Sequence, residues 1–185
     1  MTTPPPNDIV TLLLEDHQSV ERRLSDLTSS PAGARAELFW KLTDELARHE
    51  VAEEVVLYPA VRKLSGGNQL ADARIDEQSE AEQQLARMEK LDAGSPEFMA
   101  EFTDLKAAVL EHAKHEESDV FPLVKAEVAS GEQLRLAQRY QAAKRSAPNH
   151  PHPHAPDTPP GNKILGPVAA LVDRIRDAAN GLRPD

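Results

Sequence analysis

The sequence predicts an all-α protein: an up-down-up-down four-helix bundle over residues 1–145, which includes a short fifth helix. Apolar residues recur at helical spacing through this region, and proline and glycine interrupt the pattern at intervals that define four long segments. Almost no segment shows the alternation of a strand. Long helices joined by short connections pack as antiparallel neighbours, so these observations favour a bundle.

The first two helices have recognisable ends. The first is expected to have Asn7 as its N-cap and to run to about Leu27. The second should begin at Ser30–Pro31, an N-cap residue followed by proline at the first helical position. It should continue to Ser65, because Gly66–Gly67 is a typical helix stop.

The remaining helices of the bundle are bounded in the same way. The third is expected over about Gln69–Leu91. Ser95–Pro96 repeats the start signal, so the fourth helix should run from there to Ser130–Gly131. A short fifth helix is predicted over Glu132–Lys144.

A change in composition marks the end of the bundle. Residues 146–162 are rich in proline and histidine and favour an extended linker, because proline interrupts helices. Residues 163–185 are predicted to form a short amphipathic C-terminal helix that docks on the bundle or on a protein partner. Its apolar stripe consists of Val168, Leu171, Val172 and Ile175.

Composition excludes several classes of function. The net charge is -10, from 21 Lys and Arg against 31 Asp and Glu, so a nucleic-acid partner is not expected. No cysteine is available for a disulfide, a thiolate metal site or a nucleophile. No apolar run reaches the ~20 residues of a membrane span, and Met1–Asn7 does not have the pattern of a signal peptide. We therefore expect a cytoplasmic protein without membrane contact.

An internal repeat contains the residues most suited to chemistry. The pattern H-x-x-x-E-E-x-x-x-[YF]-P occurs at His49 on the second helix and again, 63 residues later, at His112 on the fourth. In each copy the histidine and the first glutamate, Glu53 or Glu116, are four residues apart and point the same way. His17 lies within the apolar stripe of the first helix.

These inward residues predict a metal site. Buried imidazole and carboxylate groups are costly unless they are paired or bind a cation, and together they suit Fe, Mn or Zn. Either motif alone is typical of a solvated pair, and a lone histidine such as His17 is usually hydrogen-bonded within a core. The repetition of the whole pattern favours metal binding.

The pattern resembles the hemerythrin-like (HHE cation-binding) domain of bacterial type, over about residues 8–130. The resemblance implies a four-helix bundle that holds two non-haem iron ions, oxo- or hydroxo-bridged. The ligands that it implies are His17, His49, Glu53, His112 and Glu116. Glu53 and Glu116 would be bridging carboxylates.

The third helix departs from the family pattern. Where a Glu-His pair is expected the chain has Glu77 and Gln78, so Gln78 takes the place of a histidine ligand. Gln78 is expected at an open or weakly filled corner of the site; Glu77 or Glu82 could supply a carboxylate there instead. The substitution is also compatible with a mixed or mononuclear centre, or with a Gln78 that faces solvent.

Residues beside the ligands are less well determined. Imidazole N–H groups that face away from metals need partners. Glu54 and Glu117 lie about 100° further round their helices; they could be such partners, but a solvated face is the main expectation for both. His115 is expected beside the site or at the surface.

Tyr58 is the candidate catalytic residue. Ideal helical spacing places it about 180° from His49 and away from the metals, although Pro59 could distort the turn. In proteins that this chain resembles, a tyrosine of the motif lies beside the iron, where it could donate a hydrogen bond. Core packing is the competing interpretation.

The predicted function is that of a non-haem di-iron protein that binds or reacts with O2, H2O2 or NO. The resemblance makes catalase-like peroxide disproportionation possible, so whether the protein is an enzyme stays open. The main competing hypothesis is a non-enzymatic iron or oxygen sensor, or an iron buffer. A bundle in which the His and Glu layer only supports the fold is a third hypothesis.

Overall fold

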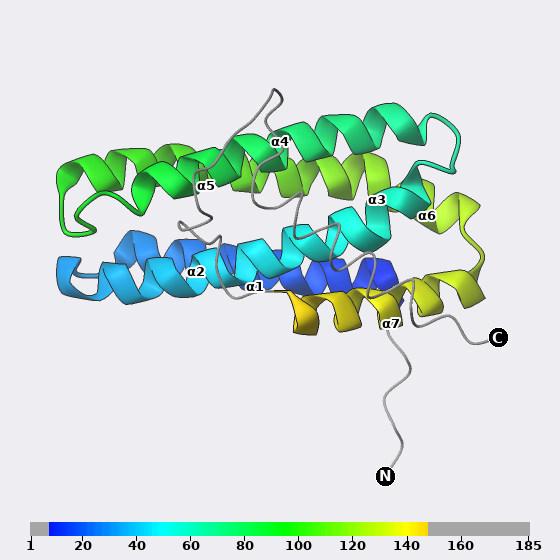
Figure 1. Ribbon diagram of the computed structural model, residues 1–185, viewed down its shortest axis with the longest axis horizontal. Helices are drawn as coiled ribbons and strands as arrows, with labels where there is room; N and C mark the ends of the chain where they lie inside the picture. Colours follow the sequence, from blue (N-terminus) through cyan, green and yellow to red (C-terminus); the bar gives the residue numbers. More distant parts are fainter. Residues whose placement is uncertain (1–7, 148–185) are drawn as a thin grey trace, which may run out of the picture.

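The computed structural model describes residues 8–147, and these residues form helices with no strand among them (Figure 1). In chain order the elements are α1 (Ile9–Ser29), α2 (Ala32–Ala52), the π-helical turn η1 (Glu53–Leu57), α3 (Tyr58–Val61), α4 (Gly67–Met88), α5 (Pro96–His115), the π-helical turn η2 (Glu116–Val120), α6 (Phe121–Glu127) and α7 (Ser130–Ser146). The all-α prediction is confirmed. The C-terminal helix predicted over 163–185, and all but two residues of the 146–162 linker, lie outside the described residues.

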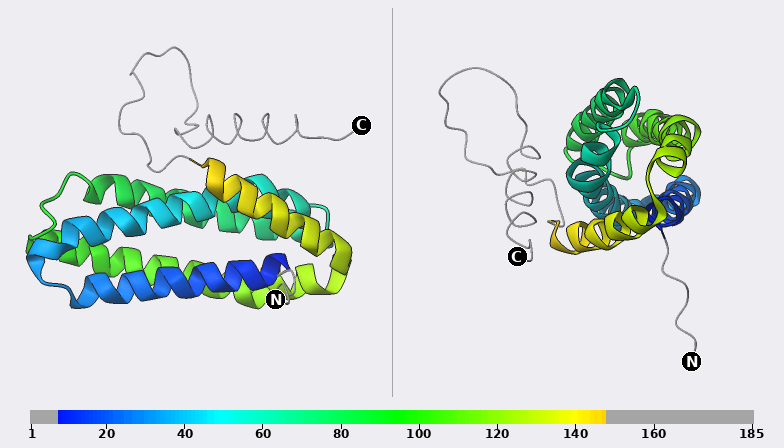
Figure 2. Two further views of the ribbon diagram at one scale, coloured as in Figure 1. Left: turned by 90° about the horizontal axis from the view of Figure 1, so that it is seen from below. Right: turned by 90° about the vertical axis from the view of Figure 1, so that its right-hand side faces the viewer.

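Four helical rods make up the bundle. α2, η1 and α3 form one rod and α5, η2 and α6 another, while α1 and α4 are the other two. Successive rods run in opposite directions, and the end-on view of Figure 2 shows them around a common axis. The fifth helix, α7, packs along α1, α2 and η1 on the outside of the bundle.

Three predicted helix starts can be compared with the structure. The N-cap of α1 is Asp8, whose carboxylate accepts a hydrogen bond from the Thr11 backbone N–H at 2.8 Å; the predicted cap, Asn7, lies outside the described residues. The predicted Ser30 cap is wrong, because its hydroxyl donates back to α1 and Pro31 occupies the N-cap position of α2. The Ser95 cap of α5 is confirmed.

Other boundaries move by a few residues. The second rod ends at Val61 rather than at Ser65, because a turn precedes Gly66. Gly66 has a φ of 72° and caps the start of α4, so the glycine pair begins the next helix more than it ends the previous one. The third helix ends at Met88 and not at Leu91, and the fifth is longer than predicted, with 17 residues.

The apolar core consists of two clusters, one toward each end of the bundle. The first contains residues of α1, the end of α2, η1, α3, the start of α4, η2, α6 and α7, and the second contains residues of α1, α2, α4 and α5. Along each rod a polar residue lies where one cluster gives way to the other. These four residues are His17, His49, Gln78 and His112. We call them, with Glu53 and Glu116, the polar layer.

None of the helices in residues 8–147 is long and apolar enough to cross a membrane.

Candidate metal centre

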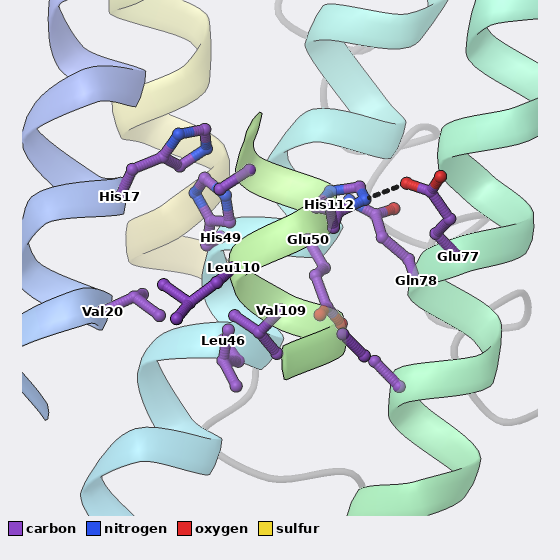
Figure 3. A pocket seen from close by; sticks show the side chains of 13 residues that line it. His17, Val20, Leu46, His49, Glu50, Glu77, Gln78, Val109, Leu110 and His112 are labelled. Carbon is purple, nitrogen blue, oxygen red and sulfur yellow. Dashed lines mark hydrogen bonds and ion pairs between the residues drawn. The ribbon is translucent and has the colours of Figure 1, made fainter. Parts of the chain in front are cut away.

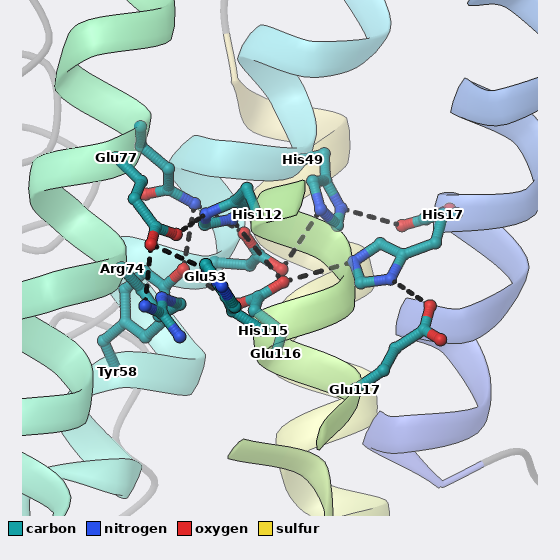
Figure 4. Close-up of polar contacts among 12 residues, drawn as sticks. His17, His49, Glu53, Tyr58, Arg74, Glu77, His112, His115, Glu116 and Glu117 are labelled. Carbon is teal, nitrogen blue, oxygen red and sulfur yellow. Dashed lines mark hydrogen bonds and ion pairs between the residues drawn. The ribbon is translucent and has the colours of Figure 1, made fainter. Parts of the chain in front are cut away.

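Four residues of the polar layer form a cluster with the composition of a metal site. His17 of α1, His49 of α2, Glu53 of η1 and Glu116 of η2 are all buried, and each has one ligand atom within 4.8 Å of the ligand atoms of the others. Figure 4 shows the four side chains converging from three of the rods. Sequence spacing alone placed these residues on inward faces, and the fold brings them together.

The histidine nitrogens and carboxylate oxygens of this cluster lie close together without satisfying one another's hydrogen bonds. His17 Nε2 lies 3.2 Å from Glu116 Oε2, and His49 Nε2 lies 3.1 Å from Glu53 Oε1. His17 Nε2, Glu53 Oε1 and Glu116 Oε2 nevertheless have no hydrogen-bond partner, although all three atoms are buried. Leaving such atoms unpaired in a core costs about 1–3 kcal/mol each. A cation held between them would remove this cost, so the donor set fits a metal ion.

His112 and Gln78 border the cluster on its other side. His112 Nε2 lies 3.6 Å from Glu116 Oε2 and also lacks a hydrogen-bond partner. The Gln78 side-chain amide donates to Glu53 Oε2 at 2.7 Å, while its buried Oε1 is unpaired. Each carboxylate therefore lies between two groups of possible metal ligands. His17 and His49 are on one side, and His112 and Gln78 are on the other. A solvent-facing Gln78 is excluded, because only 2% of its surface is exposed.

Glu117 holds His17 from behind. Its carboxylate accepts a hydrogen bond from His17 Nδ1 at 2.9 Å, which leaves Nε2 as the nitrogen that faces the cluster. Glu117 thus takes the less expected of its two positions: the side chain is half-exposed but reaches across to α1. The packing of η2 beside α1 brings it there.

Glu77 has the same role for His112. It accepts hydrogen bonds from Nδ1 of His112 and Nδ1 of His115, both at 2.9 Å, and from Arg74 at 2.7 Å. These three bonds hold its carboxylate on the outer side of His112, so the structure does not place Glu77 at a ligand position. His115 lies beside the site, which is one of its two expected positions.

Tyr58 reaches the polar layer in spite of its spacing. Its hydroxyl donates to Glu116 Oε1 at 2.8 Å and accepts from the Gln78 amide at 3.0 Å. The reason is η1, in which the Tyr58 N–H donates to the carbonyl of Glu53, five residues back. One extra residue in a turn rotates everything downstream by about 100°, so Tyr58 faces the carboxylates instead of the opposite side.

Burial and neighbouring groups shift the pKa values of the two central carboxylates in opposite directions in the protein without metal. Burial, followed by the charge of Glu116, raises the pKa of Glu53 well above its usual range. Burial also acts to raise the pKa of Glu116, but contact with His17 and the charges of His112 and His49 outweigh it and lower this pKa to about 2. In the metal-free site Glu53 therefore binds a proton more tightly than a free carboxyl group does, and Glu116 binds one less tightly.

Glu50 is a further candidate ligand, which the sequence pattern does not single out. It is buried, its Oε2 has no hydrogen-bond partner, and it lines the same cavity as His49, Gln78 and His112. Burial, followed by the charges of Glu82 and Glu54, raises its pKa well above the usual range. The repeat does not reveal it, because the corresponding residue of the second copy is Ala113.

Glu82, the second carboxylate considered for the third-helix position, is only partly buried, and its charge contributes to the raised pKa of Glu50. Burial, followed by the charge of Glu54, raises its pKa to about 7. Among the described residues it is not a member of the metal-type cluster.

Comparisons with known proteins agree with this site. A family model described as the hemerythrin HHE cation binding domain matches residues 8–124. The chain is 31% identical over 135 residues to an uncharacterized hemerythrin-like protein of Schizosaccharomyces pombe, and 31% identical over 130 residues to a DNA nickase of Nostoc sp.. No solved structure matches the chain significantly.

The matches cover 72% and 70% of this chain, but 66% and 37% of the two relatives. The family match and the buried His and Glu cluster together support a metal-binding, hemerythrin-like protein. The chain belongs to the hemerythrin HHE cation-binding domain family.

Proposed function

We propose that this chain holds two non-haem iron ions in the polar layer and that they bind or react with a small oxidant: O2, H2O2 or NO. The observation that carries the proposal is the convergence of unpaired, buried donor atoms from His17, His112, Glu53 and Glu116. Imidazole and carboxylate donors without sulfur suit iron.

The position of the carboxylates supports two ions rather than one. Glu116 Oε2 faces both His17 Nε2 and His112 Nε2, at 3.2 and 3.6 Å. Glu53 has one oxygen beside His49 and the other beside Gln78. Each carboxylate therefore lies between the two sides of the layer and could help to hold an ion on either side. His17 and His49 would hold one ion, and His112, with Gln78 or Glu50, the other.

A small cavity beside the layer supports a small ligand. Its volume is about 30 Å³, and Val20, Leu46, Ala81 and Val109 are among its apolar walls (Figure 3). His17, His49 and His112 also line it, so a molecule inside would adjoin the proposed ligands. This volume holds one or two water-sized molecules, which suits a diatomic or peroxide ligand.

The residues of the chain have distinct roles in this proposal. When bound, iron would supply the redox chemistry and an open coordination position. Tyr58 orients Glu116 through its hydroxyl, and burial, followed by the charges of Glu53 and Glu116, raises its pKa well above the usual value. The phenol therefore stays protonated and can donate a hydrogen bond at the centre. The apolar cavity walls limit access by water.

Metal content and oxygen evolution test the proposal. Protein loaded anaerobically with Fe²⁺ and desalted should retain about two irons per chain by elemental analysis, a stoichiometry that follows from the two donor groups. His49→Ala and Glu116→Ala should lose iron, whereas the control Lys114→Ala, at an exposed position of α5, should keep it. A wild-type protein that retains no metal contradicts the proposal.

The second measurement separates an enzyme from a sensor. Oxygen evolution from added H2O2 should occur with the loaded wild type and fall in His49→Ala and Glu116→Ala. Two bound irons without oxygen evolution would instead favour an iron or oxygen sensor, or an iron buffer.

A further inference from the structure

We propose that the fifth helix sets the tautomer of His49, through Tyr140, so that Nε2 presents a lone pair to the polar layer. Tyr140 lies beyond the residues 8–124 that match the family model, on a helix outside the four-rod bundle. The inference rests on the proposed function only in taking His49 as a metal ligand. In this proposal Tyr140 is a positioning residue.

Tyr140 connects α7 to the centre of the bundle. Only 1% of its surface is exposed, and its hydroxyl lies 2.7 Å from His49 Nδ1. The same hydroxyl lies 2.7 Å from Asp16 Oδ2, on α1. Asp16 in turn contacts Lys144, one turn further along α7, with 2.7 Å between Nζ and Oδ2. The fifth helix thus reaches two of the four rods through polar contacts.

The direction of the hydrogen bonds follows by elimination. The Asp16 carboxylate, ion-paired with Lys144, can only accept, so the Tyr140 O–H must donate to it. The hydroxyl proton is then used, and the Tyr140 oxygen can only accept from His49. His49 therefore carries its proton on Nδ1, and Nε2, which lies 3.1 Å from Glu53 Oε1, bears the lone pair that a cation needs.

His49 differs in this respect from the other two histidines of the layer. His17 and His112 have Nδ1 directly against a carboxylate, Glu117 and Glu77 respectively. At His49 the nearest group to Nδ1 is the neutral Tyr140 hydroxyl, at 2.7 Å, and the Asp16 carboxylate lies further away, at 3.6 Å. Because the Tyr140 hydroxyl belongs to α7, His49 can present Nε2 to the polar layer only when the fifth helix is docked correctly.

The first test uses the metal-free, full-length protein. Long-range ¹⁵N–¹H NMR of the histidine rings distinguishes the two tautomers, and the signals of His49 are assigned by their loss in His49→Asn. The wild type should show a proton on Nδ1. Tyr140→Phe removes the acceptor and should shift His49 to a mixture or to the Nε2-protonated form. An Nε2 proton in the wild type, or an unchanged pattern in Tyr140→Phe, overturns the proposal.

The second test measures metal affinity by chelator competition with Fe²⁺. Tyr140→Phe should weaken binding by about 10- to 100-fold, the usual effect of removing a partner of a ligand. Leu136→Ala is the matched control, since it truncates a buried side chain of the same helix that has no polar contact with the layer. It should lower the melting temperature and change the affinity by less than about threefold.

Equal weakening in both variants would show that Tyr140 acts only through packing, and would overturn the proposal. If the wild type binds no iron, the proposed function fails, while the NMR measurement still decides the tautomer. The two failures are therefore distinguishable.

Discussion

At the scale of single residues, the protein is defined by polar atoms buried without ordinary partners. Glu53 and Glu116 are fully buried, and each has an oxygen with no hydrogen bond. Unpaired buried carboxylates destabilise a fold, so apolar side chains normally occupy such core positions. The positions of these two carboxylates opposite His17 and His49 suit a cation held between the carboxylates and the imidazoles.

Gln78 allows a test of how the proposed second ion would be held. Its amide oxygen is a weaker donor than imidazole, so we expect Gln78→His to tighten the more weakly bound ion by about tenfold, or about 1.4 kcal/mol. Chelator competition and iron content per chain measure this. Gln78→Leu, which removes the oxygen, should have the opposite effect. Unchanged affinity in both variants would show that this side chain is not at a ligand position.

Glu82 predicts a pH dependence for the metal-free protein. Burial, followed by the charge of Glu54, raises its pKa from 4.5 to about 7 in the folded state. Folded protein then binds the proton more tightly than unfolded protein, so this contribution to stability is complete below pH 4.5 and is lost as the pH rises to about 7. The loss is up to about 3 kcal/mol.

Urea unfolding at pH 5 and pH 8, with a chelator present, measures this effect. The free energy of unfolding should fall less between the two values in Glu82→Gln than in the wild type. Glu80→Gln, at an exposed position of the same helix, is the control and should behave as the wild type does. An equal fall in Glu82→Gln and wild type would contradict the assignment.

At the scale of elements, two π-helical turns shape the site. η1 begins at Glu53 and η2 at Glu116, 63 residues later, so the sequence repeat is also a structural repeat. Each turn is followed by an aromatic residue and then a proline, which has no N–H for a regular helical bond. The extra residue directs both aromatics to the layer: Tyr58 bonds Glu116, and Phe121 stacks on His17 with ring centroids 5.5 Å apart.

The turn between α3 and α4 depends on a close approach of the backbone. A Cβ on Gly67 would lie 1.8 Å from the carbonyl oxygen of Val61, so Gly67→Ala must displace one of the two helices. We expect it to lower the free energy of unfolding by about 2 kcal/mol or more. Gly33→Ala, with no atom within 4 Å of the added Cβ, should stabilise α2 by up to about 1 kcal/mol. Urea denaturation compares the two; a Gly67→Ala protein of wild-type stability would refute the contact.

At the scale of the whole molecule, the polar layer divides the core into two apolar clusters. Each cluster packs its own end of the four rods, and the first also includes α7. The layer is thus the one level along the described rods at which metal, rather than apolar contact, would hold the helices together. Metal binding and the stability of the bundle should therefore be linked.

Metal removal tests this link. Iron at about a thousand times its dissociation constant would stabilise the fold by about 4 kcal/mol, so a chelator should lower the melting temperature by about 10 °C. Circular dichroism with and without chelator measures the shift. In His49→Ala, which lacks a ligand, the chelator should have little effect. Identical melting of loaded and chelated wild type would contradict the role of the layer.

Much of the fold and of the candidate site could be predicted from local rules. Helical spacing of apolar residues determines the four rods, and the separation of four residues between His49 and Glu53 determines that both point the same way. The repeat determines that a second such pair exists at His112 and Glu116. These features depend only on the regular geometry of a helix, which short stretches of sequence encode.

The remaining features required the tertiary structure. The turn of Tyr58 toward the layer depends on a π-helical turn, a departure from regular geometry that periodicity does not describe. Glu117, Glu77 and Tyr140 support the three histidines from other rods or from the fifth helix, 35 to 100 residues away in the chain. No local pattern specifies such contacts, because they arise only when separate helices pack at particular distances. The sequence by itself determined which residues face inward, and only the packing of the helices decided which atoms meet and which tautomer each imidazole can present.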